Sequence, residues 1–160
     1  MRTAIFLTLF LAAALPAGLR AREVKLEPLP EELSILSKKG IDCIYAVEVP
    51  EARKYFELAL QKYPDHPYPN FGMAMAKWAE IEYLEDESAP EMSGEYEKLT
   101  EKAIEVAQAW IKKHPGDANA FMVLGGMYGL RARLGLMKHR WITAYFDGRK
   151  ALSHTRKSLK

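Results

Sequence analysis

The sequence predicts an all-α protein in which antiparallel helix pairs stack into a short α-solenoid. Apolar residues recur at intervals of three and four along most of the chain, which is the period of an amphipathic helix. No segment alternates apolar and polar residues between turn signals, as a half-buried strand would. A spacing of small and aromatic residues also recurs, which indicates repeated helix pairs rather than a single bundle.

The N-terminus has the layout of a secretory signal peptide. Arg2 is followed by a 12-residue apolar run, Ala4 to Leu15, and then by Pro16 and small residues. The run is shorter than the about 20 apolar residues of a spanning helix. We therefore expect residues 1–21 to be a signal peptide and the protein to be exported to a bacterial periplasm or cell envelope. The alternatives are an uncleaved anchor and a chance apolar run. Residues 22–32 contain two prolines and are expected to form a linker.

The first two helices are expected between Pro30 and Tyr63. Pro30 and the two glutamates after it suit a helix N-terminus, and the apolar spacing continues beyond Gly40. The segment Val49 to Tyr63 is strongly amphipathic, and Pro50 suits its first turn. The sequence "PDHPYP" then ends this helix, because three prolines cannot continue it.

Four further helical stretches and one charged loop are expected in the rest of the chain. The sequence "EDESAPEMSGE" contains Pro90 and Gly94 and is predicted to be a loop. Asp117 is a plausible N-cap for the helix that follows it. The predicted helices are Asn70–Leu84, Tyr96–Lys113, Ala118–Met137 and a stretch from Trp141 to the C-terminus.

The internal repeat has two recurring patterns. Small and aromatic residues lead to a proline with the same offsets from Ala52 and from Ala103, and an aromatic residue, a small residue and a second aromatic follow each proline. Small residues let helix backbones approach, and aromatic residues fill the gaps between them. The residues expected to pack the repeats are Gly40, Ala52, Phe56, Ala59, Pro64, Phe71, Trp78, Ala103, Ala107, Trp110, Pro115, Phe121, Leu124, Gly125, Tyr128, Trp141 and Ala144.

These patterns resemble the tetratricopeptide repeat (TPR) family, most closely in "ARKYFELALQKYP" and "FMVLGGMY". The family's unit has about 34 residues, whereas Ala52 and Ala103 are 51 residues apart, so the chain is similar to divergent members with extended repeats. The resemblance covers residues 33–160, in units of roughly 33–66, 67–117 and 118–160. The pattern stops inside a helix, which suggests an exposed end face, a partner there, or a longer array.

Charge is distributed unevenly along the chain. Residues 22–130 carry 12 basic and 20 acidic side chains, whereas residues 131–160 carry nine basic and one acidic. Three interpretations remain open: the basic end attracts a charged partner, it faces an acidic surface of the same or a neighbouring chain, or it is an ordinary solvated helix face. Export argues against nucleic acid and favours an acidic protein or a membrane surface. The expected basic docking face comprises Arg131, Arg133, Lys138, Arg140, Arg149 and Lys150.

The sequence offers no constellation for catalysis, cofactor binding or metal binding. No nucleophile elbow, zinc-protease, haem or phosphate-loop motif is present. Cys43 is the only cysteine and is expected to be a small buried apolar residue, and the four histidines are scattered. Asp147 is a candidate for a buried polar contact. We therefore expect no enzyme activity, no cofactor and no metal.

The resemblance implies a binding module. In the TPR family the first helix of each pair lines a concave groove that holds a peptide or protein partner. With the register above, the groove-lining residues are Gly72, Ala76, Ala79, Asn119, Met122, Gly126 and Gly129. We expect an exported scaffold or adaptor that holds an apolar segment in this narrow groove. The alternative is a structural subunit of an envelope assembly that docks through its basic C-terminal helix. The sequence leaves the oligomeric state open.

Overall fold

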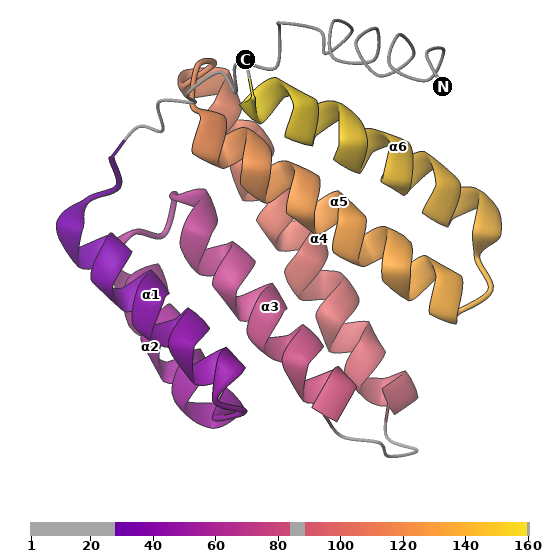
Figure 1. Cartoon of the computed structure of the whole chain (residues 1–160), viewed down its shortest axis with the longest axis horizontal. Coiled ribbons are helices and arrows are strands. Elements are labelled where there is room, and N and C mark those ends of the chain that lie inside the picture. The colour runs from indigo at the N-terminus through magenta and orange to yellow at the C-terminus, as the bar shows by residue number, and fades with distance from the viewer. Residues whose placement is uncertain (1–27, 84–88, 160) are drawn as a thin grey trace, which may run out of the picture.

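The computed structural model of the chain describes residues 28–83 and 89–159, and these are all-α. The predicted signal peptide and most of the predicted linker lie outside the described residues. The helices pair in chain order, as Figure 1 shows, and the predicted fold class is confirmed. The six helices are α1 (Glu31–Tyr45), α2 (Val49–Lys62), α3 (Pro67–Tyr83), α4 (Ala89–Lys113), α5 (Ala118–Met137) and α6 (Trp141–Ser158).

The helix pairs stack as in a solenoid. Each pair packs internally, α1 on α2, α3 on α4 and α5 on α6, and the pairs are joined by the packing of α2 on α3 and of α4 on α5. The first helices of the pairs also touch in succession, since α1 contacts α3 and α3 contacts α5. The stack therefore runs from α1 and α2 at one edge to α6 at the other (Figure 1).

Two helices begin earlier than the sequence predicts, and both contain a proline near their start. α3 begins at Pro67, so Pro67 and Pro69 occupy its first turn. α4 begins at Ala89, so Pro90 and Gly94 belong to a helix rather than to the predicted acidic loop. The physical reason is that the first amide groups of a helix have no intrahelical acceptor, so proline there costs no hydrogen bond. Glu31 and Glu32 likewise belong to α1 rather than to the linker.

The helix α5 has the bounds that the sequence predicts, Ala118–Met137. Its predicted N-cap is also confirmed, because the Asp117 carboxylate accepts a hydrogen bond from the backbone N–H of Ala120 at 3.2 Å. The same carboxylate accepts a second hydrogen bond from Trp110 Nε1 at 2.7 Å. The cap therefore ties the end of α4 to the start of α5.

A phenylalanine between two glycines joins the first pair to the second. A Cβ added to Gly40 of α1 would lie 2.5 Å from the Phe56 ring, and one added to Gly72 of α3 would lie 2.1 Å from it. The ring of α2 therefore occupies the space that side chains at both positions would need. Ala52, Ala59 and Val49 continue this core along α2.

Most of the expected packing residues are buried or half-buried, with three exceptions. Pro64 and Pro115 are exposed in the turns that follow α2 and α4. Trp141 is 60% exposed, so it does not pack the repeats. It lies at the first position of α6, whereas Ala144 of the same pattern is buried. Cys43 is half-buried rather than fully buried.

Candidate partner-binding surfaces

An apolar hollow opens between α1 and α3, the first helices of the first two pairs. It has a volume of about 200 Å³, and no charged side chain lines it. Ile41 and Tyr45 are exposed at its rim, whereas Phe56 is buried and closes it on the α2 side. We call this the α1–α3 hollow; its lining residues are Ser37, Ile41, Ile44, Tyr45, Phe56, Tyr68, Phe71, Gly72 and Met75.

Four of the seven residues expected to line a groove are buried within the monomer instead. Ala76 and Ala79 pack against α2 in the core around Phe56, and Gly72 is covered by the Phe56 ring, so that only its surface toward α1 borders the hollow. Asn119 is buried and accepts a hydrogen bond from the Tyr68 hydroxyl at 3.2 Å. A partner cannot reach Ala76, Ala79 or Asn119 in this structure.

The error on α3 is one of helix rotation. The expected positions face α2, because the small residues on that side of α3 leave space for the Phe56 ring and pack against it. The open positions are one residue earlier, at Phe71 and Met75. The sequence carried a signal for this: Phe71 and Met75 are themselves spaced by four and are large and apolar. The repeat pattern predicts Phe71 only as a packing residue.

The expected groove residues of α5 lie closer to the surface. Met122 is exposed, and Gly126 and Gly129 are half-buried. A Cβ at Gly126 would lie 3.1 Å from the Phe71 ring, so Gly126 borders the side chain that ends the α1–α3 hollow. This surface is continuous with the hollow through Phe71.

Most residues of the expected basic docking face form ion pairs within the chain. Arg131 makes two hydrogen bonds of 2.7 Å to the carboxylate of Asp147, which is buried. The predicted buried contact of Asp147 is thereby confirmed, and this pairing raises the pKa of Arg131. Arg133 pairs with Glu82 of α3.

Two more of these cations bind one carboxylate of α4. Lys138 and Arg140 lie 3.0 and 2.9 Å from Glu97 Oε1. The interpretation that the basic end faces an acidic surface of the same chain therefore holds for three of the six residues, Arg133, Lys138 and Arg140, whereas the partner of Arg131 belongs to the basic end itself. Arg149 and Lys150, both on α6, have no carboxylate partner among the described residues.

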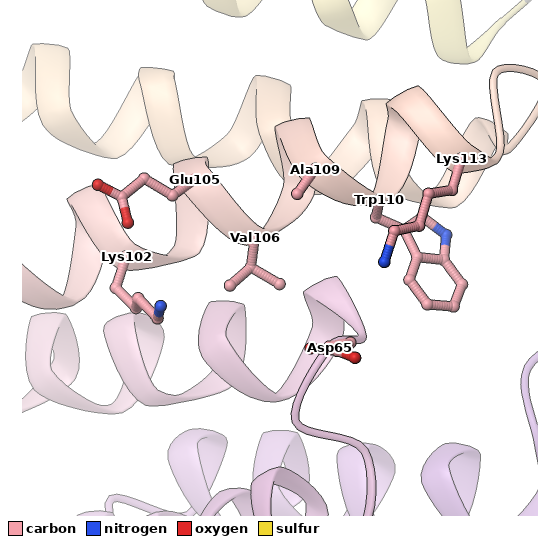
Figure 2. A pocket seen from close by; sticks show the side chains of 7 residues that line it. All are labelled: Asp65, Lys102, Glu105, Val106, Ala109, Trp110 and Lys113. Atoms are coloured by element: carbon pink, nitrogen blue, oxygen red, sulfur yellow. The ribbon is translucent and has the colours of Figure 1, made fainter.

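A second pocket, of about 240 Å³, lies between α4 and the turn before α3. Figure 2 shows α4 side chains on one side of it and Asp65, from the turn before α3, on the other. Lys102 and Glu105 place charges of both signs at its edge, and Val106 and Trp110 are its apolar part. Because the charges are mixed and exposed, the pocket selects no particular ligand charge.

The histidines beside this pocket stabilise turns. The Trp110 ring stacks on His114 with centroids 4.3 Å apart and lies 4.7 Å from the His66 ring. His66 Nδ1 accepts a hydrogen bond from the Tyr68 backbone N–H at 3.2 Å. Burial lowers the pKa of His66, so the ring is mainly neutral near pH 7. The Trp110 ring thus contacts histidines from both proline-containing turns, the one after α2 and the one after α4.

The described residues contain no group of three histidine, cysteine or acidic side chains placed to hold a metal ion. Within the same residues, no helix combines the length and apolar character needed to cross a bilayer. Comparison with known proteins found no matching family model, no matching curated protein and no matching solved structure.

Proposed function

We propose that this chain is an exported helical-repeat scaffold that binds an apolar segment of a protein partner in the α1–α3 hollow. The observation that carries the proposal is an uncharged, largely apolar hollow between the first helices of adjacent pairs, with Ile41 and Tyr45 exposed at its rim. The TPR-like spacing of the sequence supports it, because the first helices line the binding surface in that family.

The size and chemistry of the hollow favour an amphipathic helix as ligand. An apolar cavity of about 150 Å³ is known to hold a benzene molecule, so about 200 Å³ accommodates one aromatic or aliphatic side chain. The adjoining surface of Met122 and Gly126 would accept a second side chain of the same helix. Met75 on the wall is flexible and adapts to different ligand shapes. Such a pattern of spaced apolar anchors is how grooves bind amphipathic helices.

Retention of proteins from a cell-envelope extract would test this function. Ile41→Asp places a charge in the hollow, whereas Ile35→Asp changes an exposed isoleucine of the same helix outside it. We expect the wild-type chain and Ile35→Asp to retain the same protein, and Ile41→Asp to lose it by about tenfold or more, since a buried unpaired charge is costly.

A photo-crosslinking side chain at position 45 would then locate the contact. Leu58 on α2, exposed and outside the hollow, provides the control position. We expect a covalent adduct at position 45 and none at position 58. Equal retention by the two aspartate variants, or equal crosslinking at the two positions, would show that the hollow is not the binding site.

A further inference from the structure

The outer face of α6 is apolar and basic and is covered by nothing in the described chain. Only Ala144, Asp147 and Ser158 of this helix are buried. Its large apolar side chains point the other way and are between 53% and 76% exposed. We define the α6 outer face as Trp141, Ile142, Tyr145, Phe146, Arg149, Lys150, Leu152, Arg156 and Lys157.

The cations of this face have no carboxylate partner among the described residues. Arg149 lies over the Tyr145 ring, Lys150 over the Tyr128 ring and Lys157 over the Phe121 ring, at 5.2 to 6.0 Å from the ring centroids. The one acidic residue of α6 is Asp147, which is buried on the opposite side and paired with Arg131. The α6 outer face is therefore positive from Arg149 onward and carries no compensating charge of its own.

Apolar and basic side chains occupy different halves of the helix. Trp141, Ile142, Tyr145 and Phe146 lie in the first two turns. Arg149, Arg156 and Lys157 follow and, with Leu152 and Ser153, line a shallow hollow of about 420 Å³. Aromatic and branched side chains partition into the boundary between lipid headgroups and acyl chains. Arginine and lysine bind phosphate groups and keep their heads in water while their stems lie on apolar surface.

We propose that the α6 outer face binds an anionic phospholipid surface, with its first two turns inserted at the headgroup boundary and its basic half on the lipid phosphates. Two of the interpretations of the N-terminal sequence, an export signal and an uncleaved anchor, would bring the chain to a membrane. The attachment is peripheral, through a helix that lies along the surface.

A second copy of the chain fits this face less well. A symmetric dimer through α6 would place the unpaired cations of one copy against those of the other, and like charges disfavour that contact. A head-to-tail contact would need exposed carboxylates. Six of them are engaged in ion pairs within the described chain, whereas others, such as Glu57 and Glu101, are not, so a dimer is one outcome of the experiment below; the engaged residues are Glu32, Glu51, Glu80, Glu82, Glu95 and Glu97.

Attachment through α6 leaves the proposed partner site free. α6 packs on α5 at one edge of the stack, and α1 and α2 lie at the other edge (Figure 1). The α1–α3 hollow is lined by residues of α1, α2 and α3 and by none of α6. The lipid surface and the protein partner would therefore be bound by different ends of the same scaffold. The two proposals can fail independently.

Vesicle binding with the full chain would test the inference. The vesicles are phosphatidylcholine alone or an equimolar mixture with phosphatidylglycerol, and the readouts are co-sedimentation and tryptophan emission. Trp141 is exposed, whereas Trp78 is buried and Trp110 is half-buried, so a blue shift on binding reports α6. We expect a blue shift with the anionic vesicles, quenching by brominated lipid, and loss of the shift in Trp141→Phe.

Matched charge reversals distinguish vesicle binding by the cations of the α6 outer face from a general effect of the net charge of the chain. The double variant Arg149→Glu with Arg156→Glu is expected to weaken binding to anionic vesicles by about tenfold or more, as measured by Trp141 emission. High salt should also weaken the binding of the wild-type chain. Lys38→Glu with Lys112→Glu changes the net charge equally at exposed sites and should leave binding within about twofold.

The inference is overturned if Trp141 emission does not respond to anionic vesicles, even where the chain sediments with them, because the attachment then belongs to another segment. It is also overturned if Trp141 responds equally to neutral vesicles. A dimer in solution that Ile142→Ser with Phe146→Ser abolishes, without any Trp141 response to lipid, would assign the face to a second copy. Retention of an acidic protein through this face without any lipid response would likewise overturn it.

Discussion

The first and third helix pairs turn in the same way but are held together differently. In both turns one residue other than glycine adopts a positive φ, 63° at Val47 and 55° at His139. The next residue then donates a hydrogen bond five positions back, from Glu48 N to Cys43 O at 2.8 Å and from Arg140 N to Gly135 O at 2.7 Å. This is the Schellman arrangement that ends many helices, so the connection is equivalent in both pairs.

The interfaces beyond these turns differ in chemistry. The first pair joins the second through the Phe56 ring, which fills the space left by Gly40 and Gly72. The third pair is held by backbone approach and by a charge pair. A Cβ at Gly125 would lie 3.1 Å from the backbone N of Thr155, and Arg131 binds buried Asp147.

The difference shows what an edge helix needs. α2 lies inside the stack and buries an aromatic ring toward two neighbours, whereas α6 has a neighbour on one side only. Small residues and a charge pair fix α6 on α5 without using its large apolar side chains. Those side chains remain exposed on the α6 outer face. One side of α6 thus stabilises the fold by packing on α5, and the other side is left available for binding.

Removal of the central ring should have the largest effect on stability. Phe56→Ala is expected to lower the free energy of unfolding by about 3–5 kcal/mol, because it removes a buried ring and leaves a cavity. Leu58→Ala, on the exposed side of the same helix, should cost less than about 1 kcal/mol. Urea denaturation measures both. A loss below about 2 kcal/mol for Phe56→Ala would mean that the first pair does not depend on this ring.

The charge pair should be the next most important contact, and it belongs to the third pair. Asp147→Asn is expected to cost about 2–3 kcal/mol, because it leaves the guanidinium of Arg131 half-buried without its counter-charge. Glu97→Gln, at the more exposed pairs with Lys138 and Arg140, should cost less than about 1 kcal/mol. Equal losses in thermal denaturation would contradict the distinction between these two sites.

Two adjacent glycines of α5 test the backbone approach. Gly125→Ala should lower stability by about 1–2 kcal/mol, since the new Cβ would meet Thr155 Oγ1 at 2.6 Å and backbone atoms of α6 near 3.1 Å. Gly126→Ala meets only the Phe71 ring at 3.1 Å, which can shift, so the gain in helix propensity of about 1 kcal/mol should make it neutral or stabilising. Hydrogen exchange of α6 should rise in the first variant alone; the reverse order would refute the assignment.

The smallest effect is expected at the shared turn. Val47→Gly should stabilise the protein by about 0.5–1 kcal/mol, because a β-branched residue is strained at positive φ and its exposed side chain packs little. His139→Gly should change stability less, since histidine tolerates this conformation better than valine. Melting temperatures of the two variants, compared with that of the parent chain, check the prediction. Destabilisation by Val47→Gly would show that its side chain contributes to packing.

The sequence predicted the helices well, but it predicted poorly which side of each helix is exposed. The bounds of α5 and its cap at Asp117 were predictable, because both depend on residues within a few positions of one another. The start of α4 was not, because the same proline and glycine fit a loop or a helix N-terminus equally well. The open surface was missed on α3 because Gly72 and Ala76 are as suitable for helix packing as for a groove.

The sequence by itself determined the all-α class, the order of the helices and the pairing of small with aromatic residues, since periodicity and spacing are local properties. Only the tertiary structure decided which side of each helix is covered. The rotation of α3 follows from the Phe56 ring, which comes from another helix. The cations of the C-terminal region look alike in sequence, yet Arg131 is paired and Arg149 is not. That difference arises because a helix packed on one neighbour hides one side of its surface and exposes the other.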